Sequence, residues 1–84
     1  MKPVLELYGS RRCPYTTALR EHLEWKGETF VEYDVDADID AFERLGRLTA
    51  GSVAVPVLVE DGIIRSIGWQ GRTCVAEGPR DRVP

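Results

Sequence analysis

The spacing of apolar and polar residues predicts alternating strands and helices in the first half of the chain. Residues 4–8 and 29–34 are short runs rich in strand-forming side chains and bounded by turn residues. Residues 14–26 carry apolar side chains three and four positions apart, as one face of a helix requires. Asp38 can cap a second helix, because apolar residues recur every three positions in the range 39–48.

The second half of the pattern predicts a hairpin and then a third helix. Residues 55–67 read as two antiparallel strands that turn at Asp61-Gly62. Residues 68–77 can hold one short helix. The predicted order is β-α-β-α-β-β-α, an α/β fold in which the first two strands are parallel and enclose a right-handed crossover helix. We predict one domain over residues 1–77 and a C-terminal tail over residues 78–84.

Composition and charge exclude several classes of function. The chain has 84 residues, enough for one small domain with one core. Its net charge of −3 argues against a nucleic-acid-binding protein, which usually carries a basic face. No apolar run approaches the ~20 residues that span a bilayer, and the N-terminal residues lack the apolar core of a signal peptide. We therefore expect a cytoplasmic protein with no membrane partner. Two cysteines are also too few for a secreted disulfide scaffold.

Cys13 is the residue whose surroundings favour chemistry. It lies in a Cys-Pro-Tyr-Thr motif at the end of the first strand and the start of the first helix, at an edge where open α/β sheets carry active sites. The helix dipole, together with Arg11 and Arg12, is expected to stabilise a thiolate and to lower the pKa of the thiol. We expect Pro14 and Tyr15 to leave the sulfur exposed on one side. The alternative is that Cys13 is only a small residue at the helix terminus.

The motifs around Cys13 resemble those of glutaredoxins. The residues that carry this resemblance are Tyr8-Gly9-Ser10, Cys13 to Thr16, Val55-Pro56 and the segment that contains Gly68. The chain also resembles the Uxx-star family of glutaredoxin-like (seleno)proteins, in which CPYT, EYDV, VPVLVE and IGWQG recur and the first motif position can be selenocysteine. The resemblance implies a thioredoxin-like fold with a four-stranded mixed sheet flanked by helices. It also implies a cis peptide bond before Pro56, whereas the residues without the resemblance favour an ordinary trans proline at the start of a strand or on an edge strand.

The resemblance further implies glutathione as a co-substrate, with no tightly bound cofactor. The substrate groove would be lined by Tyr15, Thr16, Arg47, Val55, Pro56, Gly68 and Trp69. The glutathione motif is only partly present, because Ser10 and Ala54 replace residues typical of the family and no acidic residue follows Gly68. The expected partner is therefore glutathione or a small protein disulfide, with a reductase as a further candidate. Trp69 has a second interpretation, as a side chain that fills the core.

Thr16 stands where many redox motifs have a second cysteine. The simplest mechanism is thus a single-thiol cycle, in which Cys13 takes glutathione from a mixed disulfide and loses it to a second glutathione. Cys74 is the alternative partner, either as a resolving cysteine or as a small buried residue that packs the third helix on the sheet. Two functions outside catalysis are a redox-sensing module and an iron–sulfur cluster carrier, which the Pro14-Tyr15 pair disfavours.

The remaining polar clusters predict no metal site. The acidic stretch DVDADID, residues 34–40, lacks the glycine and glutamate of a calcium-binding loop and is expected to be a solvated loop before the second helix. The two cysteines and His22 are spaced too widely for a zinc site. His22 is expected to lie on the surface or to pack against a neighbour.

Overall fold

The computed structural model describes residues 4–79. Within them, the elements follow in the order β1 (Leu5–Gly9), α1 (Pro14–Trp25), β2 (Phe30–Asp34), α2 (Ile39–Leu48), β3 (Ala54–Val55), β4 (Val57–Glu60), β5 (Ile63–Ile67) and β6 (Cys74–Val75). The main sheet has the order β2-β1-β4-β5, with β1 and β2 parallel and the other pairs antiparallel. The predicted four-stranded mixed sheet is confirmed. A separate antiparallel pair, β3 and β6, lies beside it.

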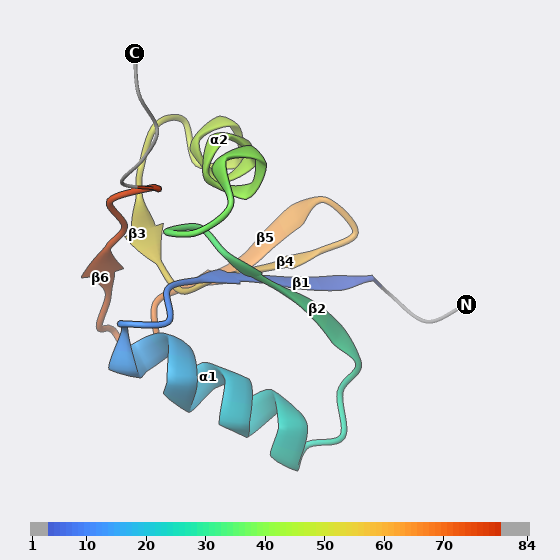
Figure 1. Ribbon diagram of the computed structural model, residues 1–84. Helices are drawn as coiled ribbons and strands as arrows, with labels where there is room; N and C mark the ends of the chain where they lie inside the picture. Colours follow the sequence, from blue (N-terminus) through green and yellow to red (C-terminus); the bar gives the residue numbers. More distant parts are fainter. Residues whose placement is uncertain (1–3, 80–84) are drawn as a thin grey trace.

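The two helices cover opposite faces of the main sheet (Figure 1). Successive side chains of a strand point to opposite faces, so β1 contributes to two apolar clusters. The α1 face holds a cluster of buried leucines: Leu5, Leu7, Leu19, Leu23 and Leu58. The α2 face holds a cluster that includes Tyr8, Val35, Ala41, Leu45, Val55, Val57 and Val59. A bidentate ion pair between Arg20 of α1 and Glu32 of β2, at 2.8 and 2.9 Å, adds a polar link.

Local signals place both helices where the pattern predicts them. Pro14 is the first residue of α1, where its missing N–H costs no hydrogen bond. The helix ends at Trp25, shortly before Gly27, whose φ of 75° interrupts helical geometry. Asp38 caps α2, because its side chain accepts a hydrogen bond from the backbone N–H of Ala41 at 3.2 Å.

The third helix predicted at residues 68–77 is wrong. This segment is a tight turn followed by β6, and no described residue in it is helical. Gly68, Gln70 and Gly71 have φ values of 88°, 52° and 80°, which a right-handed helix does not allow. The backbones of Trp69 and Arg72 close the turn with hydrogen bonds of 2.8 and 3.0 Å. The turn sends the chain back along β3, so Cys74 lies on a strand.

The end of the chain is described only to Pro79. Residues 80–84 of the predicted tail lie outside the described residues, and a domain boundary at residue 77 stays a prediction. Gly78 is buried, and a Cβ atom at this position would lie 3.2 Å from the ring of Phe42 on α2. None of the described helices is long and apolar enough to cross a membrane.

Candidate active site

The two cysteines are joined by a disulfide bond, although 61 positions separate them in the sequence. Their Cα atoms are 5.9 Å apart. Cys13 immediately precedes α1, and Cys74 begins β6, which the fold places at the same end of the main sheet (Figure 1). The alternative in which Cys74 reaches Cys13 is therefore the one that the structure contains.

The backbone of Val55 lies opposite Cys74 in the pairing of β3 with β6. The peptide bond from Val55 to Pro56 is cis, which confirms the implication of the family resemblance. Val55 is one of the residues predicted to line the substrate groove, and in this structure its backbone pairs with the strand β6 of the same chain. The N–H of Ala76 extends the contact through a hydrogen bond of 2.8 Å to the carbonyl oxygen of Val53.

Cys13 is almost completely buried, with 2% of its surface exposed. The expectation of an exposed sulfur is thus wrong for the disulfide state, since Cys74 and Tyr15 both pack against the core cluster that contains Cys13. A small hollow of about 190 Å³ opens beside the disulfide. Its lining residues are Ser10, Arg12, Cys13, Asp36, Cys74, Val75 and Glu77.

The two arginines before Cys13 are paired with carboxylates. The Nε atom of Arg11 is 3.8 Å from Asp34, and the side chain of Arg11 is 87% exposed. Arg12 lies 3.3 Å from Asp36 and 3.5 Å from Glu77. Its hydrogen bond to Asp36 is the main cause that raises the pKa of Arg12, and Glu77 adds to it. Because both positive charges face carboxylates, stabilisation of the Cys13 thiolate by these arginines stays a prediction.

Thr16 is fully buried and holds the turn that precedes Cys13. Its Oγ1 atom accepts a hydrogen bond from the backbone N–H of Ser10 at 3.2 Å. A Cβ atom on Gly9 would lie 2.7 Å from this oxygen, so only glycine fits here without a shift of Thr16. The residue at the second-cysteine position therefore has a structural contact with the end of β1.

Asp36 is the polar residue of this site that sequence reasoning missed. Its Oδ2 atom accepts hydrogen bonds from the hydroxyl of Ser10 at 2.5 Å and from Arg12 at 3.3 Å. Its Oδ1 atom accepts from the backbone N–H groups of Glu77 and Gly78 at 2.9 and 3.0 Å. Burial raises the pKa of Asp36, but these hydrogen bonds together bring it below the usual aspartate value.

A signal for Asp36 was present in the sequence. Asp36 follows β2 closely, and Cys13 follows β1 closely. Because β1 and β2 are parallel neighbours, the segments after them emerge at the same edge of the sheet. The prediction of one solvated loop for the acidic stretch is wrong for Asp36, whose side chain is only 13% exposed.

Gly68 and Trp69 lie in the turn that follows β5. The N–H of Gly68 donates to the carbonyl oxygen of Pro56 at 2.6 Å, so Gly68 contacts the cis-proline segment through the turn. Trp69 packs against the leucine cluster and against His22, with ring centroids 5.0 Å apart. His22 lies about two helical turns beyond the start of α1. Trp69 therefore fills the α1 face and does not line the hollow beside the disulfide.

Arg47 lies in a separate hollow on the α2 face. This hollow measures about 350 Å³ and is lined by Glu6, Tyr8, Arg44, Arg47 and Leu48. The guanidinium of Arg44 lies 4.6 Å from the ring centroid of Tyr33, which stacks on Tyr8. None of the residues that line this hollow lines the one beside the disulfide.

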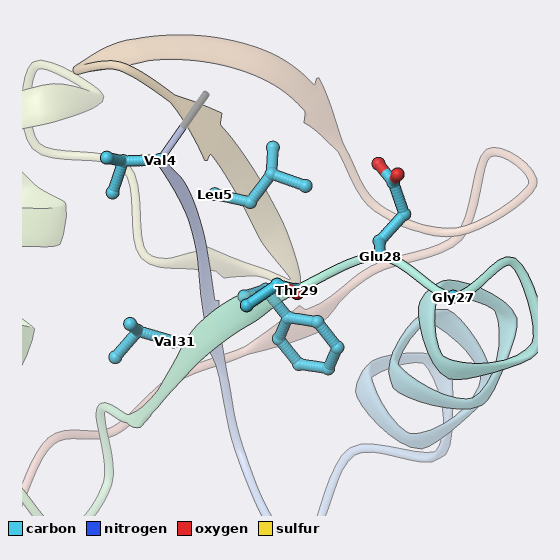
Figure 2. A pocket seen from close by; sticks show the side chains of 7 residues that line it. Val4, Leu5, Gly27, Glu28, Thr29 and Val31 are labelled. Carbon is cyan, nitrogen blue, oxygen red and sulfur yellow. The ribbon is translucent and has the colours of Figure 1, made fainter. Parts of the chain in front are cut away.

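Another hollow, of about 540 Å³, lies at the start of β1, at the opposite end of this strand from Cys13. Figure 2 shows the side chains that line it. It is bordered by the start of β1 and by the connection from α1 to β2, with residues 4–5 and 27–31 as its lining. Its surface is mostly apolar, and its polar side chains, Glu28 and Thr29, have no cysteine or histidine beside them among the lining residues, so we do not assign chemistry to it. Within residues 4–79, no three metal-ligating side chains are grouped as a metal site requires.

Comparison with known proteins agrees with this geometry. The chain matches the family model described as glutaredoxin over residues 5–64, a range that ends before Cys74. A probable glutaredoxin of Synechocystis sp. is 32% identical over 62 residues, which are 73% of this chain and 57% of that protein. The chain thus spans little more than half the length of this curated relative.

Solved structures show the same fold. The crystal structure of a mutant of the thioredoxin-like protein BC3987 has a TM-score of 0.71 and 30% sequence identity, and covers 79% of this chain and 82% of that one. A glutaredoxin from Archaeoglobus fulgidus has a TM-score of 0.66 at 22% identity, over 79% of this chain and 75% of its own. Because the family model spans both helices and most of the main sheet, the chain belongs to the glutaredoxin family and has its thioredoxin-like fold.

Proposed function

We propose that this protein is a thiol–disulfide oxidoreductase whose redox couple is the pair Cys13 and Cys74. The observation that carries the proposal is the disulfide between them. It joins the motif cysteine of a glutaredoxin-family chain to a cysteine held opposite Val55. Membership of the family supports the same class of reaction.

The reaction transfers two electrons from the protein to a substrate disulfide. The Cys13 thiolate attacks one substrate sulfur, which forms a mixed disulfide and releases the first substrate thiolate. The Cys74 thiolate then attacks Sγ of Cys13, so that the bond between Cys13 and Cys74 forms and the second substrate thiolate leaves. The two protons of the original Cys13 and Cys74 thiols end on the two substrate thiols. Two equivalents of glutathione, or the dithiol of a reductase, return the protein to its reduced state.

The position of Cys13 suits its role as the nucleophile. It stands at the start of α1, where the backbone N–H groups and the helix dipole favour a thiolate. A thiolate at this place is also a good leaving group when the disulfide is reduced. Arg11 and Arg12 contribute to this stabilisation only to the extent that their carboxylate partners release them.

The substrate class that fits the site is an extended thiol compound, either glutathione or a cysteine-containing segment of a protein. Cys74 bonds to Cys13 while its backbone pairs with Val55. A substrate cysteine in the same position would pair with β3 as an added strand. Because β6 already pairs with β3 in this structure, such a substrate can pair with β3 only after β6 has moved away. The cytoplasm, with its thiol reductants, is the compartment that suits this cycle.

A single-thiol cycle with glutathione at Cys13 is the second candidate, and the CPYT motif favours it. The same motif supports a relationship to the Uxx-star family. In this cycle Cys74 would act as a packing residue in the reduced protein. The two candidates differ in which species accumulates when the reduced protein meets oxidised glutathione.

Intact mass spectrometry after exposure of the reduced protein to oxidised glutathione separates these candidates. We expect the wild-type mass to fall by two hydrogen atoms, whereas Cys74→Ser should carry one glutathione on Cys13. Cys13→Ser should lose disulfide-reductase activity. A stable glutathione adduct on the wild-type protein, the same as on Cys74→Ser, would contradict the paired mechanism and support the single-thiol cycle.

A further inference from the structure

Asp36 connects the two segments that carry the cysteines. Its Oδ2 atom accepts hydrogen bonds from Ser10 and Arg12, in the loop that leads to Cys13. Its Oδ1 atom accepts from the N–H groups of residues 77 and 78, shortly after Cys74. The hydroxyl of Ser10 also accepts a hydrogen bond from the backbone N–H of Arg12 at 3.2 Å. The loop before Cys13 is therefore linked to the carboxylate through both the Ser10 hydroxyl and the Arg12 side chain.

We propose that Asp36 is a positioning residue that holds the Cys74 segment against the Cys13 loop and thereby favours the disulfide over the dithiol. This inference rests on the proposed function of the two cysteines as a redox couple. Asp36 acts through the position of Cys74 and takes no part in the exchange of electrons.

The Cys74 segment has few other restraints that would survive reduction. The strands β3 and β6 are only two residues long, and such a short pair is marginal by itself in water. Val75 is 76% exposed and buries little surface. The other contacts of the segment include the hydrogen bond from Ala76 to Val53, the buried side chain of Ala76, the ion pair of Glu77 with Arg12 and the packing of Gly78 on Phe42. The carboxylate of Asp36 supplies two charge-assisted hydrogen bonds, which are roughly twice as strong as neutral ones.

The disulfide and Asp36 restrain the same segment, so each favours the other. In the reduced protein, Asp36 keeps Cys74 near Cys13 and raises the effective concentration of one thiol at the other. Without the carboxylate, the reduced segment gains conformational freedom, and closing the disulfide then costs more entropy. Loss of Asp36 should therefore make the disulfide easier to reduce.

The test is the equilibrium between disulfide and dithiol in glutathione redox buffers, measured by alkylation of the free thiols in the purified protein. Asp36→Asn keeps the shape of the side chain, but its amide nitrogen cannot accept hydrogen bonds from Ser10 and Arg12. We expect the equilibrium constant for disulfide formation to fall about tenfold, which makes the reduction potential about 30 mV less negative. Ser10→Ala, which removes one hydrogen bond, should shift it in the same direction by less.

Two control variants separate positioning from general effects. Asp40→Asn removes a carboxylate from the exposed first turn of α2, and Asp38→Ala weakens the cap of that helix. Both should leave the potential unchanged, although Asp38→Ala lowers stability. If Asp36→Asn does not fold, the reduction potential of Ser10→Ala tests the proposal in its place.

The outcomes for the two proposals differ. A wild-type disulfide whose potential is the same in Asp36→Asn and Ser10→Ala would overturn the inference and leave the proposed function intact. A wild-type protein that forms no bond between Cys13 and Cys74 in any buffer would overturn the proposed function, and the inference with it.

Discussion

At the scale of single residues, the motif around Cys13 uses its polar side chains for structure. Thr16 accepts a hydrogen bond from Ser10, and Ser10 in turn donates to Asp36. These contacts fix the loop between β1 and α1, which positions Cys13. The motif shows that position 16 is a threonine where many redox motifs have a cysteine. Only the structure shows that its hydroxyl accepts a hydrogen bond from Ser10.

Thr16→Val should lower the free energy of unfolding by about 1–3 kcal/mol, because the buried N–H of Ser10 loses its acceptor. The substitution preserves the volume of the side chain and its packing against Gly9. Urea denaturation of the reduced protein measures the change. Thr17→Val is the matched control, since the Thr17 hydroxyl makes no hydrogen bond within the described residues. Equal effects at the two positions would contradict the structural role of Thr16.

The lowered pKa of Asp36 predicts a pH dependence of stability. The unfolded value is about 3.9 and the folded value is lower. The stabilisation is therefore fully present above about pH 4 and is lost as the pH falls through the folded value. The stability difference between wild type and Asp36→Asn should be large near neutral pH and should shrink in acid, as measured by urea denaturation across this range.

Other charged groups lie beside Asp36. Arg12 and Glu77 form an ion pair beside it, and Asp34 accepts a hydrogen bond from the backbone N–H of Asp36. Glu77→Gln and Asp34→Asn therefore serve as controls. A difference between wild type and Asp36→Asn that is constant from neutral to acid pH would contradict the assignment to Asp36.

At the scale of elements, the helices and the main sheet follow the sequence pattern closely. The predicted helix at 14–26 is observed as Pro14–Trp25, and the cap at Asp38 is observed before Ile39. The failure lies at residues 68–77, where weak helical periodicity gives way to glycines with positive φ. The glycines in the sequence indicate that a turn can form here. The hydrophobic pattern does not indicate that the residues after the turn pair with β3.

Asp38→Ala should lower the free energy of unfolding by about 0.5–2 kcal/mol, because the N–H of Ala41 loses its capping acceptor. Chemical denaturation followed by circular dichroism measures this loss. Asp40→Asn, two residues further on in the first turn of α2 and without a capping contact, should change stability by less. A variant Asp38→Ala as stable as the wild type would show that the cap contributes nothing to α2.

At the scale of the whole molecule, one disulfide bond joins the residue before α1 to the last described strand. The disulfide spans 61 positions, and β6 has few apolar contacts of its own. In a small domain with two small apolar clusters, such a disulfide raises the free energy of unfolding, because it restricts the conformations of the unfolded chain.

Reduction of the disulfide should lower the free energy of unfolding by about 2–4 kcal/mol. Urea denaturation of the oxidised protein and of the same protein in dithiothreitol gives the difference. The variant with both Cys13→Ala and Cys74→Ala is the control, because dithiothreitol should not change its stability. Equal stability of the oxidised and reduced wild-type protein would contradict this prediction.

The sequence by itself determined the cap at Asp38, the location of Cys13 at a helix start and the order of the elements up to residue 67, except that the single strand predicted from Val55 is divided at Pro56 into β3 and β4. These features depend on neighbouring residues, whose spacing and conformational preferences are visible in the chain. The resemblance of the Val55-Pro56 pair to the family motif added the cis bond. The partner of Cys13, the role of Thr16 and the four hydrogen bonds of Asp36 were decided only by the tertiary structure. The physical reason is that the disulfide and the bonds of Asp36 join segments far apart in the chain, which are brought together by the packing of the sheet and, for residues 74–78, by the turn at Gly68. The contact of Thr16 with Ser10 depends on the conformation of the loop before α1.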